Sequence, residues 1–481
     1  MLGKRKKHIF SVKQFQPNNE VTASSIMVEV DGLKILLDLG LLQNSQYNFK
    51  QTYHINMQKI QSIPFKELDY IVINHGHLDH SMSAIAYANG FEGQLISTEL
   101  TSELSKVNME DEYKINFKDI KTYGENEYHV YFNQDHIDEA FNNTRCYDYD
   151  QQIRLNEHVT IELKSACHLS GASMTYITYQ DEYITKRLLY TSDITYGHLV
   201  DRPFTKRINC GKLKCDYLIL ESTYGLREKE VFEEEHPIDF LERIIMEDVV
   251  QKNKILFIPS FAIHRSTELC YYLYKIFERN EYIKKANIPV RFCGKLMKQA
   301  HDIIGKKEMF CYYDEQWQNE RDIWDKEPFD FLTTIEDVEH FCMNNSRQIV
   351  ISSAGMFDKG FSNVLSKFYI PNNKVSVLAC GYLAENSLGW KIKNGFKEVD
   401  IGGINRQVRC KFRGTIPSLS GHATHQGLID FTKSLNQSVL KDIILVHGTD
   451  EAKQDLKEDL EKELSSNKKI HIIKQFEILK F

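Results

Sequence analysis

Residues 70–80 read Tyr-Ile-Val-Ile-Asn-His-Gly-His-Leu-Asp-His, an apolar run followed by three imidazoles and a carboxylate. The apolar run has the composition of a buried strand. A strand that ends in a loop can direct successive side chains into one small volume, so His75 and His77 can share one cation while Asp79 and His80 take a second. The stretch therefore predicts a site for two adjacent metal ions, with a solvated polar turn as the alternative.

Other apolar runs of strand length continue this pattern along the chain. They occur at 33–37, 160–163, 188–191, 217–220, 255–258, 349–352, 375–379, 443–446 and 470–473. Most are unbroken rather than alternating, which is typical of strands covered on both faces by helices. Residues 450–464 alternate Glu and Lys at helical spacing and predict a surface helix, and the charged stretch 226–248 predicts a solvated helix that opens a new domain. The fold class predicted is α/β.

Length and composition exclude several classes of protein. The 481 residues, 42% of them hydrophobic, are enough for two to three domains with buried cores. The net charge of −7 argues against a generally basic nucleic-acid-binding protein. Ten cysteines without a Cys-x-x-Cys pair favour reduced thiols. Because no secretory signal and no apolar stretch of bilayer length is present, we expect a cytoplasmic protein without a membrane partner.

Polar residues with metal-ligand chemistry follow several of the predicted strands. Asp38, Asp193, Glu221 and His447 come directly after apolar runs, and His168 lies in a short polar segment after another. A single His or Asp after a strand is more often a structural residue. Together they indicate one shared crevice, because open α/β sheets place ligands at the carboxyl ends of their strands.

The order of Asp38, His-x-His-x-Asp-His, His168 and Asp193 resembles the metallo-β-lactamase superfamily. Later motifs resemble its β-CASP branch of nucleases, which includes RNase J and the endonuclease subunit of the cleavage and polyadenylation machinery. These motifs are LESTYG at 220–225, IPSFA at 258–262, SSAGM at 352–356, SGH at 420–422 and VHG at 446–448. The resemblance implies a metallo-β-lactamase αββα sandwich, residues 1–224 and 395–481, with an inserted α/β β-CASP domain, residues 225–394.

The resemblance also implies the ligands of two zinc ions, with Mn²⁺ as another occupant compatible with mixed nitrogen and oxygen donors. Asp193 is expected to bridge the ions, and Asp79 is counted among the catalytic residues as well as the ligands. The expected set is His75, His77 and His168 for one ion, Asp79, His80 and His447 for the other, and Asp193 for both.

Further roles carry over from the same family. His422 resembles the histidine that protonates the leaving oxygen, and Glu221 resembles the acidic residue that pairs with it. Asp38 resembles the carboxylate that orients the histidine loop. Arg265 and Ser420 match residues that contact substrate phosphate, with a helix-surface arginine and a turn serine as their structural alternatives.

His425 is the rival of His422 for the role of general acid. The family pattern is Ser-Ala-His-x-Asp, and this chain departs from it with Gly421 and Thr424. The match to Ser420-Gly421 favours His422.

Taken as a whole, the resemblance implies a zinc-dependent ribonuclease. A metal-bound hydroxide would attack RNA phosphorus and leave 3′-hydroxyl and 5′-phosphate ends. RNA, single-stranded in preference, is the expected substrate because DNA-processing relatives carry an apolar residue where this chain has His447. An endonuclease is expected because the chain ends soon after this residue. The alternatives are a 5′-exoribonuclease, a DNA nuclease and a non-enzymatic RNA-binding scaffold. A homodimer is compatible with all of these.

Overall fold

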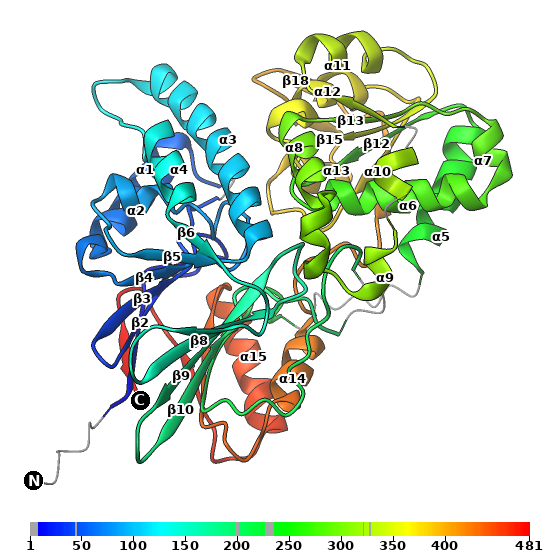
Figure 1. The fold of residues 1–481 in the computed structure, drawn as a ribbon. Helices are drawn as coiled ribbons and strands as arrows, with labels where there is room; N and C mark the ends of the chain where they lie inside the picture. The colour runs from blue at the N-terminus through cyan, green and yellow to red at the C-terminus, as the bar shows by residue number, and fades with distance from the viewer. Residues whose placement is uncertain (1–7, 44–45, 198–201, 227–234, 321, 327–328) are drawn as a thin grey trace, which may run out of the picture. The chain divides into compact units, whose positions relative to one another are not determined.

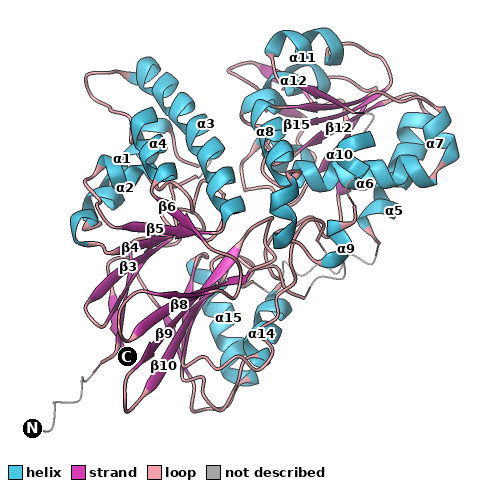
Figure 2. Ribbon diagram, viewed as in Figure 1, coloured by secondary structure: helices cyan, strands magenta, loops and turns pink. Residues whose placement is uncertain are grey.

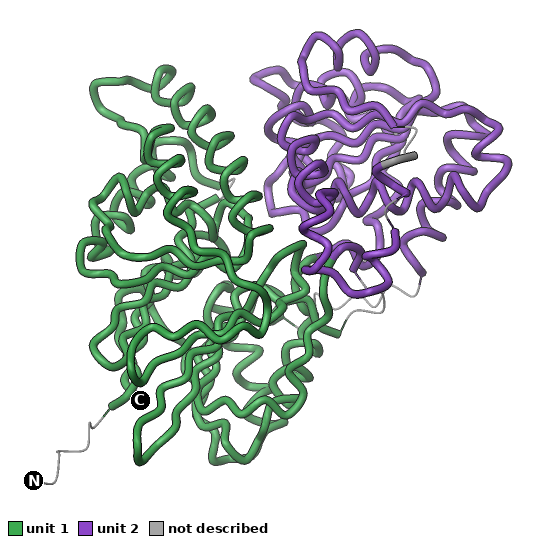
Figure 3. Tube along the Cα trace, viewed as in Figure 1, with its two compact units in different colours: residues 1–198, 205–231, 421–481 green, residues 199–204, 232–420 purple. Residues whose placement is uncertain are grey.

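The computed structural model describes residues 8–43, 46–197, 202–226, 235–320, 322–326 and 329–481. It divides into two compact units (Figure 3). Unit 1 comprises residues 1–198, 205–231 and 421–481, and unit 2 comprises residues 199–204 and 232–420.

Unit 1 contains two seven-stranded sheets of mixed direction (Figure 1). In the first, β3, β4, β5 and β6 run parallel, and β1, β2 and β22 add antiparallel pairs. Its order is β22 (Ile478–Lys480), β1 (Phe10–Gln14), β2 (Ile26–Val30), β3 (Leu33–Leu37), β4 (Tyr70–Val72), β5 (Gln94–Ser97) and β6 (Thr144–Cys146).

In the second sheet of unit 1, the four neighbouring strands β10, β11, β20 and β21 run parallel. The order is β21 (Lys469–Ile472), β20 (Asp442–Val446), β11 (Tyr217–Glu221), β10 (Thr185–Tyr190), β9 (Ser173–Gln180), β8 (Val159–Ser165) and β7 (Gln152–Arg154). Because the carboxyl ends of parallel neighbours meet at one edge, the residues that follow β10, β11 and β20 are brought together.

Helices cover the outer faces of the two sheets. They are α1 (Phe49–Ser62), η1 (Phe65–Glu67), α2 (Ala84–Ala88), α3 (Glu99–Tyr123), α4 (Gln134–Asn142), α14 (His425–Ser434) and α15 (Asp450–Glu463). The first helix starts with a capping box formed by Asn48 and Gln51. One apolar core lies between the first sheet and α1 to α4, and another joins the facing sides of the two sheets. The αββα sandwich is therefore confirmed.

Unit 2 is built on a six-stranded parallel sheet (Figure 2). Its order is β14 (Asp330–Leu332), β13 (Val290–Cys293), β15 (Gln348–Ser352), β12 (Ile255–Pro259), β16 (Val375–Ala379) and β19 (Lys411–Thr415), and β17 (Glu398–Asp400) pairs separately with β18 (Asn405–Gln407). Its helices are α5 (Pro237–Ile244), η3 (Ile245–Val250), α6 (Arg265–Arg279), α7 (Glu281–Lys285), α8 (Lys295–Ile304), η4 (Lys307–Tyr312), α9 (Glu315–Gln318), α10 (Asp322–Lys326), α11 (Ile335–Cys342), α12 (Gly360–Tyr369) and α13 (Leu388–Lys393). The inserted α/β domain is confirmed.

Every apolar run that predicted a strand contains or overlaps one, and the helix predicted over 450–464 is α15. The C-terminal part of the sandwich domain was predicted to begin at residue 395, whereas unit 1 resumes at Gly421. The difference arises because β19 pairs with β16 and so keeps the intervening chain in unit 2. Of the charged stretch 226–248, residues 227–234 lie outside the described residues. Within the described ranges, no helix combines the length and apolar character needed to cross a bilayer.

Candidate metal centre

The loop after β4 carries the histidine cluster and is held against the end of β3. Asp38 accepts a hydrogen bond from the backbone nitrogen of Asn74 at 2.8 Å. Gly40 lies so close to the loop that a Cβ atom there would be 1.6 Å from the carbonyl oxygen of Asp79, so only glycine fits. The residues that follow β3 therefore position the loop.

Four strand ends at this edge turn sharply. Asp38, Cys167, Ser192 and His447 all have positive φ angles, between 50° and 58°. Left-handed backbone is unfavourable for residues other than glycine, and it concentrates at functional sites where the surrounding structure imposes it. These turns aim the side chains at or next to the strand ends into one volume of unit 1.

The Asp38 carboxylate orients His80. Its Oδ2 atom accepts hydrogen bonds of 2.8 Å from His80 Nδ1, Tyr190 Oη and Ser192 Oγ. Burial raises the pKa of Asp38, and nearby His75 together with the hydrogen bonds from Asn74, Ser192 and Tyr190 opposes that rise. Because a carboxylate accepts, Nδ1 of His80 carries the proton and Nε2 presents a lone pair to the cluster.

Asp193 lies at the centre of the predicted ligands. Its Oδ2 atom is 3.5 Å from His75 Nε2, 3.4 Å from His80 Nε2 and 3.7 Å from His168 Nε2. Its Oδ1 atom is 3.2 Å from His447 Nε2. One carboxylate thus faces both halves of the cluster, the arrangement that a bridging ligand requires.

The predicted ligands form two groups that share this centre. His75, His77, His168 and Asp193 make one group, and Asp79, His80 and His447 make the other, with the ligand atoms of each group within 4.8 Å of one another. The structure therefore brings together all seven side chains that the sequence selected. Their roles as metal ligands remain predictions.

The electrostatics of the cluster suit a cation. Burial and neighbouring imidazoles lower the pKa of His75, His80 and His168 well below the ordinary value, and they lower that of His447 to about 3. These histidines are therefore neutral, which is the form that binds metals. Burial, then the nearby carboxylates, raises the pKa of Asp193 well above its usual range.

Two buried nitrogen atoms of the cluster indicate whether a metal ion would fit there. Nε2 of His75 and Nε2 of His80 are buried and make no hydrogen bond to any residue that the structure describes. Leaving such an atom unsatisfied costs about 1–3 kcal/mol. A divalent cation would satisfy these lone pairs and offset the repulsion between the buried carboxylates, so the residues fit a metal centre of mixed nitrogen and oxygen donors.

His422 and Glu221 form a pair beside the cluster. Nδ1 of His422 lies 2.9 Å from Glu221 Oε2, and its Nε2 lies 4.0 Å from Asp193 Oδ2. Burial alone would raise the pKa of Glu221, but His422, by charge and hydrogen bonding, holds it below its ordinary value. Glu221 is therefore a carboxylate that accepts from Nδ1. The His422 ring is 20% exposed, and its Nε2 points toward the centre of the ligand cluster.

The rival histidine has different neighbours. Nδ1 of His425 lies 2.8 Å from the carbonyl oxygen of Gly225, and its Nε2 lies 3.0 Å from Asp459 Oδ2. Thr424 caps α14 by accepting from the backbone nitrogen of Gly427. A threonine can thus supply the helix cap at the position where the family pattern has aspartate. This geometry favours His422 as the residue that serves the centre.

Arg265 and Ser420, predicted to contact substrate phosphate, belong to unit 2. Arg265 is buried at the start of α6, and its guanidinium pairs with Glu268, which also binds Arg202. Arg202 in turn donates to the carbonyl oxygen of Ser420. The structural alternative of an exposed helix arginine is therefore wrong, because Arg265 is buried in an ion-pair network. Contact of either residue with phosphate remains a prediction.

Several supporting residues carry no signal in the sequence. Tyr190 and Ser192 bind Asp38, and Asn74 anchors the loop, but such residue types are common at strand ends. Lys59 is the least expected of them, because it is 1% exposed within α1 and donates to the carbonyl oxygen of Gly40. Burial lowers the pKa of this lysine to about 7. Only the packing of α1 against the loop reveals that Lys59 is buried.

Comparisons with known proteins agree with this geometry. A metallo-beta-lactamase superfamily domain matches residues 27–201, a Beta-Casp domain matches residues 266–392, and a Zn-dependent metallo-hydrolase RNA specificity domain matches residues 405–473. A solved structure from Enterococcus faecalis V583, described as a protein of unknown function, shares the fold with a TM-score of 0.55 at 12% identity. It covers 98% of this chain and 100% of that chain.

Curated relatives extend over most of the chain. Integrator complex subunit 11 of Danio rerio is 26% identical and covers 93% of this chain and 70% of its own length. Cleavage and polyadenylation specificity factor subunit 3-II of Arabidopsis thaliana is 27% identical over 92% of this chain and 68% of its own length. Probable RNase MJ4 of Methanocaldococcus jannaschii is 26% identical over 89% of this chain and 91% of its own length. With these three domains in this order around one His and Asp cluster, the chain belongs to the β-CASP branch of the metallo-β-lactamase superfamily of metal-dependent hydrolases.

Proposed function

We propose that this chain is a zinc-dependent endoribonuclease that hydrolyses phosphodiester bonds of single-stranded RNA and leaves 3′-hydroxyl and 5′-phosphate ends. The central observation is Asp193, whose carboxylate faces imidazoles of both ligand groups, with Oδ2 near His168 and His80 and Oδ1 near His447. The RNA specificity model and the relative named as an RNase support RNA as the substrate. The relative named as a cleavage factor supports internal cutting.

Two divalent ions are proposed for the centre, zinc in preference and manganese as a substitute. His75, His77 and His168 would hold one, Asp79, His80 and His447 would hold the other, and Asp193 would contact both. When bound, such a pair supplies Lewis acidity toward a phosphoryl group and activates water at neutral pH. The buried Asp38 keeps His80 in the tautomer that can bind metal.

His422 is proposed to donate the proton to the departing 3′-oxygen. Glu221 accepts from Nδ1, so the transferable proton of the imidazolium is on Nε2, the atom nearer Asp193. Because Glu221 is a buried carboxylate, it stabilises the imidazolium and fixes the ring plane. A water oxygen bonds to phosphorus as the P–O3′ bond breaks, and His422 protonates the leaving 3′-oxygen, so the RNA 2′-hydroxyl takes no part.

A circular single-stranded RNA tests this function. An endonuclease linearises the circle, whereas a 5′-exonuclease leaves it intact, and a matched DNA circle tests the DNA nuclease alternative. We expect the RNA circle to be cut in the presence of zinc or manganese, with the Asp79→Ala protein inactive. Binding of the circle without cleavage under all metal conditions would favour the scaffold alternative.

The ends of the products test the chemistry. We expect a 3′-hydroxyl that a poly(A) polymerase extends and a 5′-phosphate that a 5′-phosphate-dependent exonuclease degrades. Fragments with 2′,3′-cyclic phosphate would refute direct hydrolysis, because they form only when the 2′-hydroxyl attacks phosphorus.

A further inference from the structure

Three parallel strands of unit 2 end side by side at the carboxyl edge of its sheet. β12 pairs with β15 on one side and with β16 on the other. The chains stay together beyond the paired residues, because the Ser260 amide donates to the carbonyl oxygen of Ser352 at 2.8 Å and the Ser260 hydroxyl lies 3.4 Å from Cys380 Sγ. Residues 261, 353–356 and 381–382 follow directly and are therefore neighbours at this edge.

Two aromatic side chains at this edge are exposed. Phe261 is 37% exposed, and Tyr382 is 49% exposed. Gly355 lies against the Phe261 ring, because a Cβ atom at this glycine would be 3.2 Å from two of the ring carbons. A single exposed aromatic residue needs no explanation, but two together at the carboxyl ends of parallel strands lie where α/β sheets bind ligands.

The same edge joins two sequence motifs that the proposed chemistry leaves unused. Phe261 belongs to IPSFA at 258–262, and Gly355 belongs to SSAGM at 352–356. Because a larger residue at 355 would press on the ring, the glycine permits the close approach that supports Phe261 from one side. The ring is thus held in place while part of its surface stays open to a partner.

The side chains around the two rings carry both signs of charge. Exposed Lys359 lies in the segment after β15, where its carbonyl oxygen accepts from the Ala354 amide at 3.3 Å. Exposed Lys295 follows β13, the other neighbour of β15. Asp358 and Glu385 lie close to these groups and offset the two cations. The edge therefore offers flat apolar contact with little net charge, which suits unpaired bases more than a run of phosphates.

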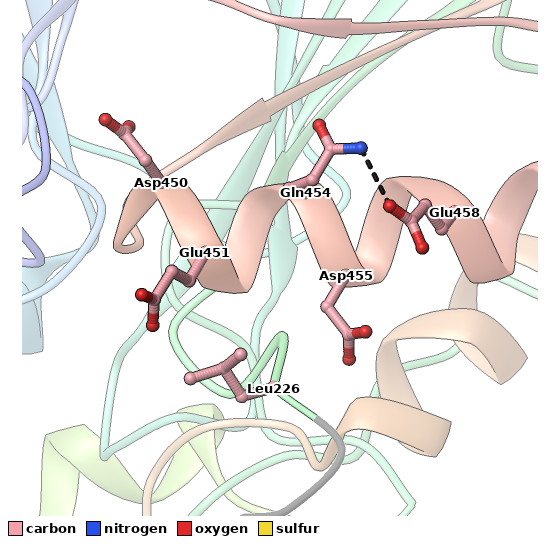
Figure 4. A pocket seen from close by; sticks show the side chains of 6 residues that line it. All are labelled: Leu226, Asp450, Glu451, Gln454, Asp455 and Glu458. Atoms are coloured by element: carbon pink, nitrogen blue, oxygen red, sulfur yellow. Dashed lines mark hydrogen bonds between the residues drawn. The ribbon is translucent and has the colours of Figure 1, made fainter.

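A hollow elsewhere in the chain has the opposite character. An open pocket of about 600 Å³ in unit 1 is lined by Leu226, Gln454 and four carboxylates, those of Asp450, Glu451, Asp455 and Glu458 (Figure 4). Carboxylates repel phosphate groups, so this pocket does not fit RNA.

We propose that Phe261 and Tyr382 stack on unpaired bases of the RNA substrate. The inference rests on the proposed ribonuclease function, which supplies the RNA. Stacking on an aromatic ring tolerates any sequence, because every base has a π face. It discriminates against duplex RNA, whose bases are already stacked on one another. The two rings would therefore be a source of preference for single strands.

Steady-state cleavage of a labelled single-stranded RNA by the full chain with Mn²⁺ tests the proposal. The variants are Phe261→Ala and Tyr382→Ala. The matched control is Phe368→Ala/Tyr282→Ala, which removes one phenylalanine and one tyrosine that are 51% and 76% exposed in the same unit. These two lie at the end of α12 and on α7, shortly before the next strand starts, and so at the opposite edge of the sheet.

We expect each alanine variant at the carboxyl edge to raise KM about 5- to 150-fold. The kcat should stay unchanged, because stacked bases are bound equally in the ground state and the transition state. The control should have wild-type KM. Phe261→Tyr and Tyr382→Phe should retain wild-type KM because the rings remain, a rescue that a purely structural role of the ring would not link to the bases. An RNA with abasic nucleotides should therefore be cleaved with the same KM by the variants and wild type.

Wild-type KM for normal RNA in both alanine variants would overturn the proposal, as would an equal rise of KM on normal and abasic RNA. If Phe261→Ala folds poorly, Tyr382→Ala tests the proposal alone, since it truncates a half-exposed side chain. Absence of cleavage by wild type would count against the proposed function instead. Fluorescence anisotropy of the same RNA in EDTA then tests stacking without catalysis: weaker binding by the alanine variants alone supports it, and equal binding by all proteins overturns it.

Discussion

The Asp38→Asn substitution tests how the centre is prepared for metal. It preserves the shape of the side chain but replaces one carboxylate oxygen with an amide NH₂ group. The hydroxyl groups of Tyr190 and Ser192, each 2.8 Å from Oδ2, can rotate and accept from the new donor. The Nδ1–H group of His80, also at 2.8 Å, cannot do so unless its proton moves to Nε2, the atom predicted to bind metal.

The free-energy cost of restoring the metal-binding tautomer of His80 sets the expected loss of metal affinity. This cost is about that of losing one hydrogen bond to a charged group, 1.5–3 kcal/mol. This corresponds to a loss of about ten- to a hundredfold in affinity for one ion, and removal of a buried negative charge acts in the same direction. Zn²⁺ affinity is measured by competition with a fluorescent chelator, with Glu221→Gln as the control that alters the other carboxylate–histidine pair. Wild-type affinity for both ions in Asp38→Asn would refute the proposed orienting role.

Three further outcomes follow from the geometry. His422→Ala should lower turnover on RNA by about 10²–10⁴-fold while the zinc content measured by mass spectrometry stays unchanged, and equal metal loss in His77→Ala and His422→Ala would reassign the latter as a ligand. Glu221→Gln should also lower turnover with full metal content, and a variant as active as wild type would contradict its pairing role. In the metal-free protein, the pKa of Lys59 is about 7 in the folded state and has its ordinary value of 10.5 in the unfolded chain. The unfolded chain therefore binds the extra proton between these values, and stability rises with pH. Lys59→Met should therefore reduce the slope of unfolding free energy against pH by about 1.4 kcal/mol per unit between pH 7.5 and 9.5 in urea titrations, and an unchanged slope would show that this lysine is protonated in the fold.

Several strands found from the sequence, such as β11, β12, β15 and β16, are buried on both faces. Runs such as 255–258 and 217–220 are continuously apolar because helices or a second sheet cover both sides. Several strands that were not predicted are short, half-exposed or alternating, although β9 is long and mostly buried. β1 alternates buried and half-buried residues, and β6 is mostly exposed. Their membership in a sheet depends on pairing with distant partners, such as β22 for β1.

The histidine loop differs from the rest of the site in how it could be found. Its residues are adjacent in sequence, so their chemistry is visible without a structure. His168, Asp193 and His447 are ordinary residues by themselves, and a motif resemblance was needed to select them. Arg265 shows the limit of that approach, because its burial beside Glu268 follows from packing in unit 2 that no local pattern reveals.

By itself, the sequence determined the donor chemistry of the His-x-His-x-Asp-His loop, the α/β class and the resemblance to the β-CASP branch, since these depend on residue identity and local spacing. Only the tertiary structure decided that Asp193 faces both ligand groups, that Asp38 holds the His80 tautomer, and that His422 rather than His425 lies beside the cluster. Those facts depend on distances between strand ends far apart in the chain. Such distances are set by parallel pairing and by the packing of two sheets, which no single segment encodes.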